Sequence, residues 1–260
     1  PVPAIDECGD EYTETAIIAP SGDDLLLTEN QRPGCAVGEG SVRLGAADNA
    51  LVSVMITQGP PGFTVPQNVS ANIATDGDFY MNSLPAGTYV FETVDNCGTA
   101  RQKTVTIQGY QVVNNTVNVQ PNCGSFNIQL QFASNGSNLQ SFWLQKYNEV
   151  TGTWGHPGSG NPYTEGTLPT AGNSLLLTNN TSNNTLIYTG EFRIVRAFHV
   201  YSNGSTTNFR CLEIIDTFEF GGVPVIEGAY NFPCANNTSE VIIDATGVAP
   251  LHYEITTMDN

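Results

Sequence analysis

The chain has 260 residues and a net charge of −17, from 25 acidic and 8 basic side chains. So negative a surface repels phosphate backbones, and nucleic acid is therefore not an expected partner. No apolar run approaches the roughly 18 residues needed to cross a bilayer, and the opening PVPAIDECGD lacks the basic and apolar regions of a signal peptide. We expect no membrane span in this segment.

The composition predicts an all-β protein. Charged residues are only 13% of the chain, and the 26 Gly and 15 Pro accompany many Asn, Thr and Ser, which favours strands joined by turns over helices. The length suggests about two domains of ordinary size.

Acidic residues gather at the start of the chain, in IDECGDEYTE, and again in DGD at Asp76–Asp78. The first cluster contains Asp6, Glu7, Asp10, Glu11 and Glu14. Both clusters could supply oxygen ligands to Ca²⁺, but neither fits a defined calcium loop. The alternative is a solvated strand edge that discourages edge pairing. We expect no cofactor, with Ca²⁺ at these clusters kept as the alternative.

The six cysteines fall as three closely spaced pairs: Cys8 with Cys35, Cys97 with Cys123, and Cys211 with Cys234. Each enclosed stretch contains a strand-like run, a break with Gly, a second apolar run, and a Pro one or two residues before the closing Cys. A disulfide needs Cα atoms about 4.4 to 6.8 Å apart, so a return strand must bring the chain back. We predict that strand 101–108 runs out and strand 112–120 returns, so that Cys97 meets Cys123. The same reasoning predicts a disulfide-clamped hairpin for each of the other two pairs. Six reduced, buried cysteines are the alternative.

A tyrosine precedes the second cysteine pair. LPAGTYVFETVDNC, residues 84–97, resembles IYTGEFRIVRAFHV, residues 187–200, with Gly87 over Gly190 and Tyr89 over Phe192. Tyr89 suits a tyrosine corner, in which its hydroxyl bonds to the backbone at the rim of a sandwich. Phe192 cannot make that bond.

The stretch SFWLQKYNEVTGTWGHP, residues 141–157, predicts a hairpin with a turn at NEVTG and a second strand that ends near Trp154. Exposed aromatic rings here would suit stacking on a sugar ring, and the candidates are Trp143, Trp154 and Tyr163. The alternative, which a tryptophan in such a sandwich favours, is that these rings belong to the core.

Stretches after the closing cysteines also share a layout of two alternating strands around a small-residue turn. The chain therefore predicts tandem Ig-like or fibronectin-like β-sandwich modules. The predicted boundaries are the end of one module at 1–35, complete modules at 36–123 and 124–234, and the beginning of another at 235–260.

Nothing in the sequence points to catalysis. The histidines, His156, His199 and His252, have no second His or Cys at metal-ligand spacing, and no Gly-x-Ser-x-Gly or phosphate-loop motif is present. We expect a protein that is not an enzyme and that has no catalytic or metal-binding residues.

The motifs SLPAGTYVFETVDNCG and GVAPLHYEI, together with FWLQKYNEVTGTWGHP…YTEG and YTGEFRIVRAFHVYSNG, resemble repeats of the giant SprB-like gliding-motility adhesins of Bacteroidota. The resemblance covers most of the chain. It implies export by type IX secretion, display on the cell surface as an outer-membrane-attached filament, and contact with the secretion and motility machinery. It transfers no catalytic residues.

Three functions follow as hypotheses. The leading one is a structural repeat of an extracellular adhesin filament that attaches a gliding cell to a surface or polysaccharide. The second is a carbohydrate-binding segment of a secreted enzyme, and the third is a surface-assembly module with contacts between sheet edges.

Overall fold

The structure is a computed structural model that describes residues 2–5, 11–14, 27–47, 49–122, 124–136, 139–221, 225–234, 238–247 and 254. These residues form antiparallel strands and loops, with one 3-10 turn at Ser70–Asn72 and no α-helix. The predicted all-β class is confirmed. Within the described ranges, no helix is long and apolar enough to cross a membrane.

The first sandwich consists of two sheets packed face to face. One sheet has the order β3-β4-β7, formed by Leu27–Pro33, Glu39–Ala46 and Phe79–Pro85. The other has the order β6-β5-β8-β9, formed by Gln67–Asn68, Leu51–Gln58, Gly87–Asp95 and Ala100–Ile107. Alternate side chains of both sheets meet in one core, which includes Val42, Leu44, Ile56, Phe79 and Phe91. This period-two burial is what the strand geometry requires.

The second sandwich repeats this arrangement. Its sheets have the orders β10-β11-β15 and β13-β12-β16-β17. The strands are Val112–Asn122, Ser125–Ser134, Thr181–Leu186, Thr153–Gly155, Gln140–Asn148, Gly190–Ser202 and Ser205–Phe220, in the order just given. A short extra strand, β14 (Leu175–Leu177), pairs with the free part of β12. The core includes Phe126, Ile128, Leu144, Phe192 and Ile194.

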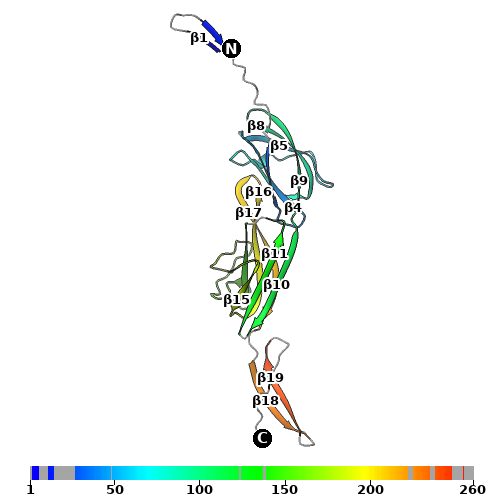
Figure 1. Cartoon of the computed structure of the whole chain (residues 1–260), viewed down its shortest axis with the longest axis vertical. Helices are drawn as coiled ribbons and strands as arrows, with labels where there is room; N and C mark the ends of the chain where they lie inside the picture. Colours follow the sequence, from blue (N-terminus) through cyan, green and yellow to red (C-terminus); the bar gives the residue numbers. More distant parts are fainter. Residues whose placement is uncertain are drawn as a thin grey trace.

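Strand for strand, the two sandwiches have the same sheet order once β14 is set aside. The internal repeat is therefore visible in the topology, and Figure 1 shows the two sandwiches following one another along the long axis. Two further hairpins are described: β1 (Val2–Ile5) with β2 (Glu11–Glu14), and β18 (Val225–Pro233) with β19 (Ser239–Thr246). The Ig-like or fibronectin-like assignment of the modules stays a prediction.

The predicted hairpin of 101–108 with 112–120 is wrong. Strand β9 pairs with β8, and β10 pairs with β11. The physical reason is that each strand buries its apolar residues in a different core: Val105 and Ile107 lie in the first, whereas Val117 and Val119 pack against the second. The chain between them crosses from one sandwich to the other.

The strand pairing also puts the boundaries between the sandwiches at positions other than those that the cysteine spacing predicted. Strand β3 lies before the predicted boundary at residue 35, yet it pairs with β4 and contributes Leu27 to the first core. Strand β10 lies before the predicted boundary at residue 123, yet it pairs with β11 of the second sandwich. The predicted boundaries fall at hairpin turns inside sheets.

The cysteine pairing is likewise corrected. Cys35 and Cys211 are bonded to each other across 176 residues, so the predicted pairs Cys8–Cys35 and Cys211–Cys234 are wrong. Cys97 and Cys234 are exposed free thiols, so the Cys97–Cys123 pair is not formed either. Cys8 and Cys123 themselves lie outside the described residues. The prediction assumed that a cysteine pairs within its own hairpin, but the bond links two sandwiches.

Two local predictions are confirmed. The hydroxyl of Tyr89 donates to the carbonyl of Pro85 at 2.7 Å, as a tyrosine corner requires. Hairpin β12–β13 forms with its turn at the NEVTG stretch, and β13 ends at Gly155, next to Trp154.

Candidate functional site: the joint between the sandwiches

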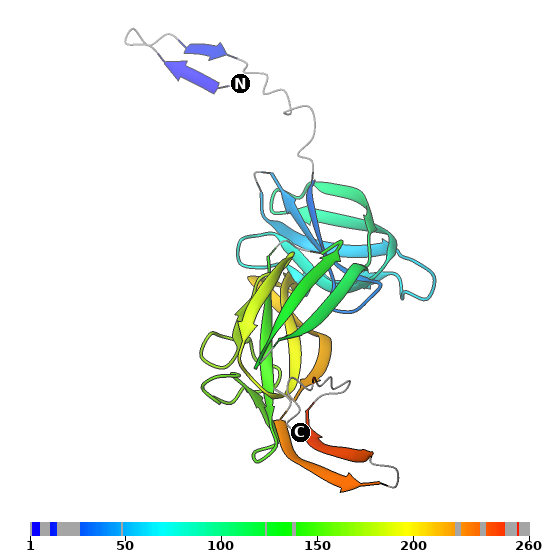
Figure 2. The ribbon, with the colours of Figure 1, turned by 60° about the horizontal axis from the view of Figure 1, so that its bottom comes forward.

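Hairpin β16–β17 reaches beyond its own sandwich. Its strands contain 13 and 16 residues, and they pair from Gly190 opposite Phe220 to Ser202 opposite Ser205. The core of the second sandwich takes Phe192 and Ile194 from the first part of β16, whereas Phe198 and Val200 lie in a separate cluster with Tyr110 and Cys211. The far half of the hairpin therefore packs at the joint, the contact between the two sandwiches, and not in the core of the second sandwich. Figure 2 shows the two sandwiches meeting there.

The tip of this hairpin docks on the rim of the first sandwich through backbone hydrogen bonds. The N–H of Gly204 donates to the carbonyl of Tyr80 at 3.1 Å, and the N–H of Asn82 donates to Oδ1 of Asn203 at 2.9 Å. The N–H of Tyr201 donates to the buried Oγ of Ser41 at 3.2 Å. These bonds fix the position of the tip because each joins a group of one sandwich to the other.

Aromatic and cationic side chains cover the same contact. The Tyr201 ring packs against Tyr80, with ring centroids 5.8 Å apart, and the Arg32 guanidinium lies 4.2 Å from the Tyr201 ring centroid. A second donor of Arg32, Nη1, reaches Oδ1 of Asn208 at 2.5 Å. Arg32 thus holds both strands of the hairpin from the first sandwich.

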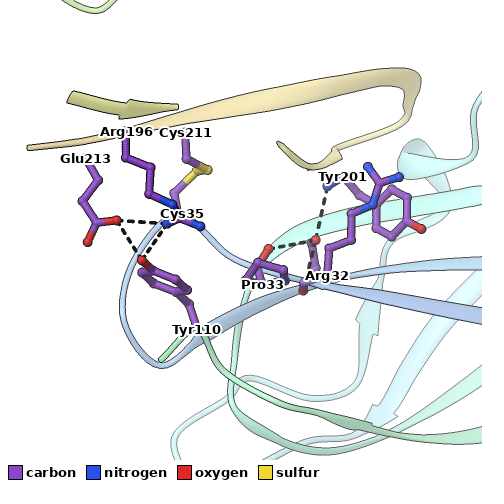
Figure 3. The surroundings of a disulfide bond; sticks show 9 residues. Arg32, Pro33, Cys35, Tyr110, Arg196, Tyr201, Cys211 and Glu213 are labelled. Carbon is purple, nitrogen blue, oxygen red and sulfur yellow. Dashed lines mark hydrogen bonds and ion pairs between the residues drawn. A yellow bond between two sulfur atoms is a disulfide. The ribbon is translucent and has the colours of Figure 1, made fainter. Parts of the chain in front are cut away.

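The disulfide lies beside this contact, at the turn where β3 passes into β4. Figure 3 shows the Cys35–Cys211 bond next to Arg196, Tyr110 and Glu213. Cys211 is buried on β17 and faces Phe198 and Val200. The bond therefore joins the first hairpin turn of one sandwich to the last strand of the next.

Arg196 is the largest fully buried side chain of the described residues. Its guanidinium donates to Tyr110 Oη at 2.7 Å, to Glu213 Oε2 at 3.1 Å and to Gln140 Oε1 at 2.7 Å. It also lies 4.0 Å from the Phe198 ring centroid. A buried cation needs such partners, since removing it from water costs several kcal/mol.

Tyr110 completes this network from the short linker between the sandwiches. Its hydroxyl donates to Glu213 Oε2 at 2.7 Å, and its ring stacks on Phe198 with centroids 5.3 Å apart. Burial, followed by the hydrogen bond to Glu213, raises the pKa of Tyr110 well above its ordinary value. The phenol therefore stays a neutral donor between a carboxylate and a guanidinium.

The linker itself is held against the first sandwich. The N–H of Tyr110 donates to the carbonyl of Glu39 at 2.7 Å, and the carbonyl of Tyr110 accepts from Gly38 at 2.9 Å. A side chain at Gly109 would collide with the backbone of Gly38, only 2.5 Å from the position of its Cβ. Glycine is required there by close approach, so the linker is a fixed element of the joint.

The predicted acidic sites fare differently. Asp78 pairs with Arg43, whose Nη2 lies 2.5 Å from Oδ2, and Asp76 accepts from the Tyr80 hydroxyl at 2.6 Å. Arg43 and Tyr80 therefore already pair with the carboxylates that a Ca²⁺ ion would need as ligands. Asp6, Glu7 and Asp10 lie outside the described residues, and the side chains of Glu11 and Glu14 are not described. Elsewhere in the described ranges, no group of three His, Cys, Asp or Glu could hold a metal ion.

The three aromatic candidates for ligand contact separate from one another. Tyr163 is buried, and its hydroxyl donates to the carbonyl of Thr167 at 2.5 Å. Trp143 is half-buried on β12, and its indole N–H donates to Ser141 Oγ at 2.8 Å. Trp154 is half-buried on β13 and lines a surface cleft.

Arg193 explains how Trp154 and Tyr163 are placed. Its guanidinium lies 4.5 Å from the Trp154 ring centroid and 5.5 Å from that of Tyr163. The guanidinium is fixed by Gln145 Oε1 at 2.7 Å and Glu165 Oε1 at 2.5 Å. Tyr163 is thus committed to internal packing, whereas Trp154 has Arg193 as one neighbour and the cleft as another.

The cleft has a volume of about 550 Å³ and lies near the start of β16, away from the joint. Its wall contains the end of β12, strand β13, the loop that follows β13, and the first residues of β16. The side chains that matter for its chemistry are Lys146, Tyr147, Trp154, His156 and Glu191.

The histidines have structural partners or none. His156 accepts backbone N–H groups of Gly158 and Ser159 at Nδ1, at 3.0 and 3.1 Å. Among the residues that the structure describes, the buried Nδ1 of His199 has no hydrogen-bond partner, and burial lowers the pKa of His199. His252 lies outside the described residues.

Sequence reasoning missed the joint. The residues that build it are Arg32, Cys35, Tyr80, Tyr110, Arg196, Tyr201, Cys211 and Glu213. One signal was available: Arg193 and Arg196 interrupt the apolar run FRIVRAFHV, and a cation inside a buried strand implies dedicated partners. The identity of those partners was not readable, because Tyr110 and Gln140 are far away in sequence.

No protein-family model matches this chain, and a search of curated proteins finds no match either.

Proposed function

We propose that this chain is a structural, load-bearing segment of an extracellular adhesive filament, as its resemblance to gliding-motility adhesins implies. The observation that carries the proposal is the Cys35–Cys211 bond between the two sandwiches. Disulfides persist in oxidising compartments, which supports a place outside the cell. Export by type IX secretion and attachment of a gliding cell are parts of the same proposal.

The bond has a direct mechanical meaning. When the chain is pulled from both ends, tension arriving along the first residues reaches Cys35 and passes through the disulfide to Cys211. The chain between the two cysteines is closed in a loop that the pulling force bypasses. Both sandwich cores lie almost entirely inside this loop. A filament built in this way keeps its length under load.

The buried joint supports the same role. The hairpin tip, the Arg196 network and the linker at Gly109 each fix the second sandwich against the first. The negative charge of −17 would keep neighbouring filaments apart by repulsion. An extended, stiff and mutually repelling segment suits a protein that must reach a surface.

Single-molecule force spectroscopy on the chain, tethered by its two ends, tests the proposal. The loop spans 176 residues, which at about 3.5 Å per residue hides ~60 nm of chain. The oxidised protein is expected to release none of this length, and the double variant Cys35→Ser/Cys211→Ser is expected to release most of it. Equal release by both proteins would refute the load-bearing role.

A Cys97→Ser variant is the matched control. Cys97 is an exposed free thiol that takes no part in the Cys35–Cys211 bond, so its removal should leave the extension trace unchanged.

A further inference from the structure

We propose that the cleft beside Trp154 in the second sandwich binds an uncharged saccharide. This deepens the proposed function, since it gives the filament segment a ligand class and a contact site. The cleft lies at the opposite end of β16 from the joint, so occupancy would leave the docked hairpin intact.

An aromatic pair forms one wall of the cleft. The rings of Tyr147 and Trp154 have centroids 5.2 Å apart at an interplanar angle of 55°, and both residues are half-buried. One face of a sugar ring presents mainly C–H groups, which gain by leaving water for an aromatic surface. Arg193 holds the Trp154 ring from inside, so the platform is preformed.

Glycines help to keep the cleft open. Gly158, Gly160 and Gly190 all line it. Gly190 has a φ of 119°, and a Cβ there would lie 2.9 Å from Cε of Lys146. A larger residue would therefore press on the lysine stem and narrow the cleft. The volume of about 550 Å³ lies within the usual range for small-ligand sites.

Polar groups on the rim match the hydroxyls of a sugar. His156 uses Nδ1 as an acceptor for two backbone N–H groups, so its proton is on Nε2, which is left as a donor. Lys146 forms no ion pair among the described residues, although carboxylates greatly outnumber cations in this chain. Glu149 and Glu191 supply acceptors on the same rim.

The charge of the cleft selects against anionic polymers. The lining of the cleft contains one lysine and two glutamates, and the whole chain carries a net charge of −17. Uronate or sulfated polysaccharides would therefore be repelled on approach. A neutral hexose or pentose polymer suffers no such penalty and can use both the donors and the acceptors.

The test is a fluorescence titration on the full chain with Trp143 replaced by Phe, which leaves Trp154 as the single reporter. Soluble cellohexaose, xylohexaose, laminarihexaose and maltohexaose are titrated to millimolar concentration beside hexagalacturonate. We expect a saturable change in Trp154 emission with at least one neutral oligosaccharide and none with hexagalacturonate.

Matched variants locate the binding. Lys146→Ala and Glu191→Gln change rim side chains that do not contribute to the core, and together they should weaken binding at least fivefold while the thermal melt is preserved. Glu92→Gln, at an exposed site on β8 of the first sandwich and outside the cleft, should leave binding unchanged.

Three results would overturn the inference: no saturable response to any neutral oligosaccharide, tighter binding of hexagalacturonate, or binding unaffected by the rim variants. None of them involves Cys35 or Cys211, so a failure here is distinguishable from a failure of the load-bearing role.

Discussion

Hairpins β8–β9 and β16–β17 occupy the same place in the sheet order of their sandwiches, but they end differently. The first closes at Asp95, after which the chain turns through Cys97 and Gly98. The second continues to Ser202 before it turns. The longer hairpin is the one that docks on the neighbouring sandwich and carries a bonded cysteine.

A single position accounts for much of this difference. With Gly87 aligned to Gly190, Asp95 corresponds to Phe198. Asp95 accepts the N–H groups of Cys97 and Thr99 at 3.0 and 2.9 Å, which closes the turn. The hydrogen bond from Arg101, joined by that from Thr99, lowers the pKa of Asp95. Phe198 offers no such acceptor and instead stacks on Tyr110, so the strands continue.

The comparison teaches that the fate of a cysteine follows the length of its hairpin. On the short hairpin, the Asp95 turn presents Cys97 to solvent. On the long hairpin, Cys211 is carried to the first sandwich and lies against the turn that contains Cys35. The following predictions test the comparison, from the largest expected effect to the smallest.

Replacing Cys211 by Ser should remove the largest single contribution to the joint. Closure of a 176-residue loop corresponds to about 5 kcal/mol of the free energy of unfolding on loop-entropy grounds. Urea unfolding of oxidised protein should show this loss, and Cys97→Ser should change the free energy by less than about 0.5 kcal/mol. Similar losses for both variants would mean that the two hairpins do not differ as described.

Replacing Arg196 by Ala should cost about 3 kcal/mol, because it removes a fully buried side chain and leaves its half-buried partners, Gln140 and Ser134, without their donor. Arg43, which is 41% exposed beside Asp78, provides the control on the first sandwich. Its replacement by Ala should cost at most about 1 kcal/mol. Urea unfolding of both variants checks this. A larger loss of unfolding free energy for Arg43→Ala than for Arg196→Ala would contradict the prediction.

High pH should weaken the protein between about pH 10 and 12. Burial raises the pKa of Tyr80 and of Tyr89 to about 12, against 10.0 for an unperturbed tyrosine. In this window the unfolded chain has already lost these protons and the folded chain still holds them, so stability falls as pH rises. Thermal melts at intervals of half a pH unit check this, and a flat profile from pH 9 to 12 would contradict it.

Replacing Tyr89 by Phe should have the smallest effect, a loss of about 1 kcal/mol, since only the hydrogen bond to Pro85 disappears. The variant makes the first sandwich resemble the second, which already has Phe192 at the matching position. It should also reduce the stability loss at high pH. A gain in the free energy of unfolding would contradict this, because it would mean that the Tyr89 hydroxyl destabilises the folded protein.

The sequence predicted those features that depend on local pattern. Alternation and turn residues were sufficient for the all-β class, for hairpin β12–β13 and for the corner at Tyr89. The alignment of Gly87 with Gly190 also placed the start of β8 on the start of β16. The alignment is wrong just before these strands, where it matches Ile187 to the buried Leu84. Ile187 is exposed, and its neighbour Leu186 is the buried residue.

What could not be predicted depends on partners far apart in the chain. Strand β9 resembles the start of a hairpin, but its partner is decided by which core receives Val105 and Ile107. The disulfide could not be deduced from spacing, because cysteine spacing does not specify connectivity. For the cleft, the sequence offered Trp143, Trp154 and Tyr163 equally, and they are separated only by the burial of Tyr163 and by the place of Trp154 in the lining of the cleft.

The long reach of the Cys35–Cys211 bond has a consequence for biogenesis. Cys35 is made 176 residues before its partner, so it must wait as a thiol until nearly all of both sandwiches has been synthesised. The two sulfur atoms then meet only if β17 has found its place beside β16 and the hairpin tip has docked. A molecule that contains the Cys35–Cys211 bond is thus one in which both sandwiches have been assembled and docked.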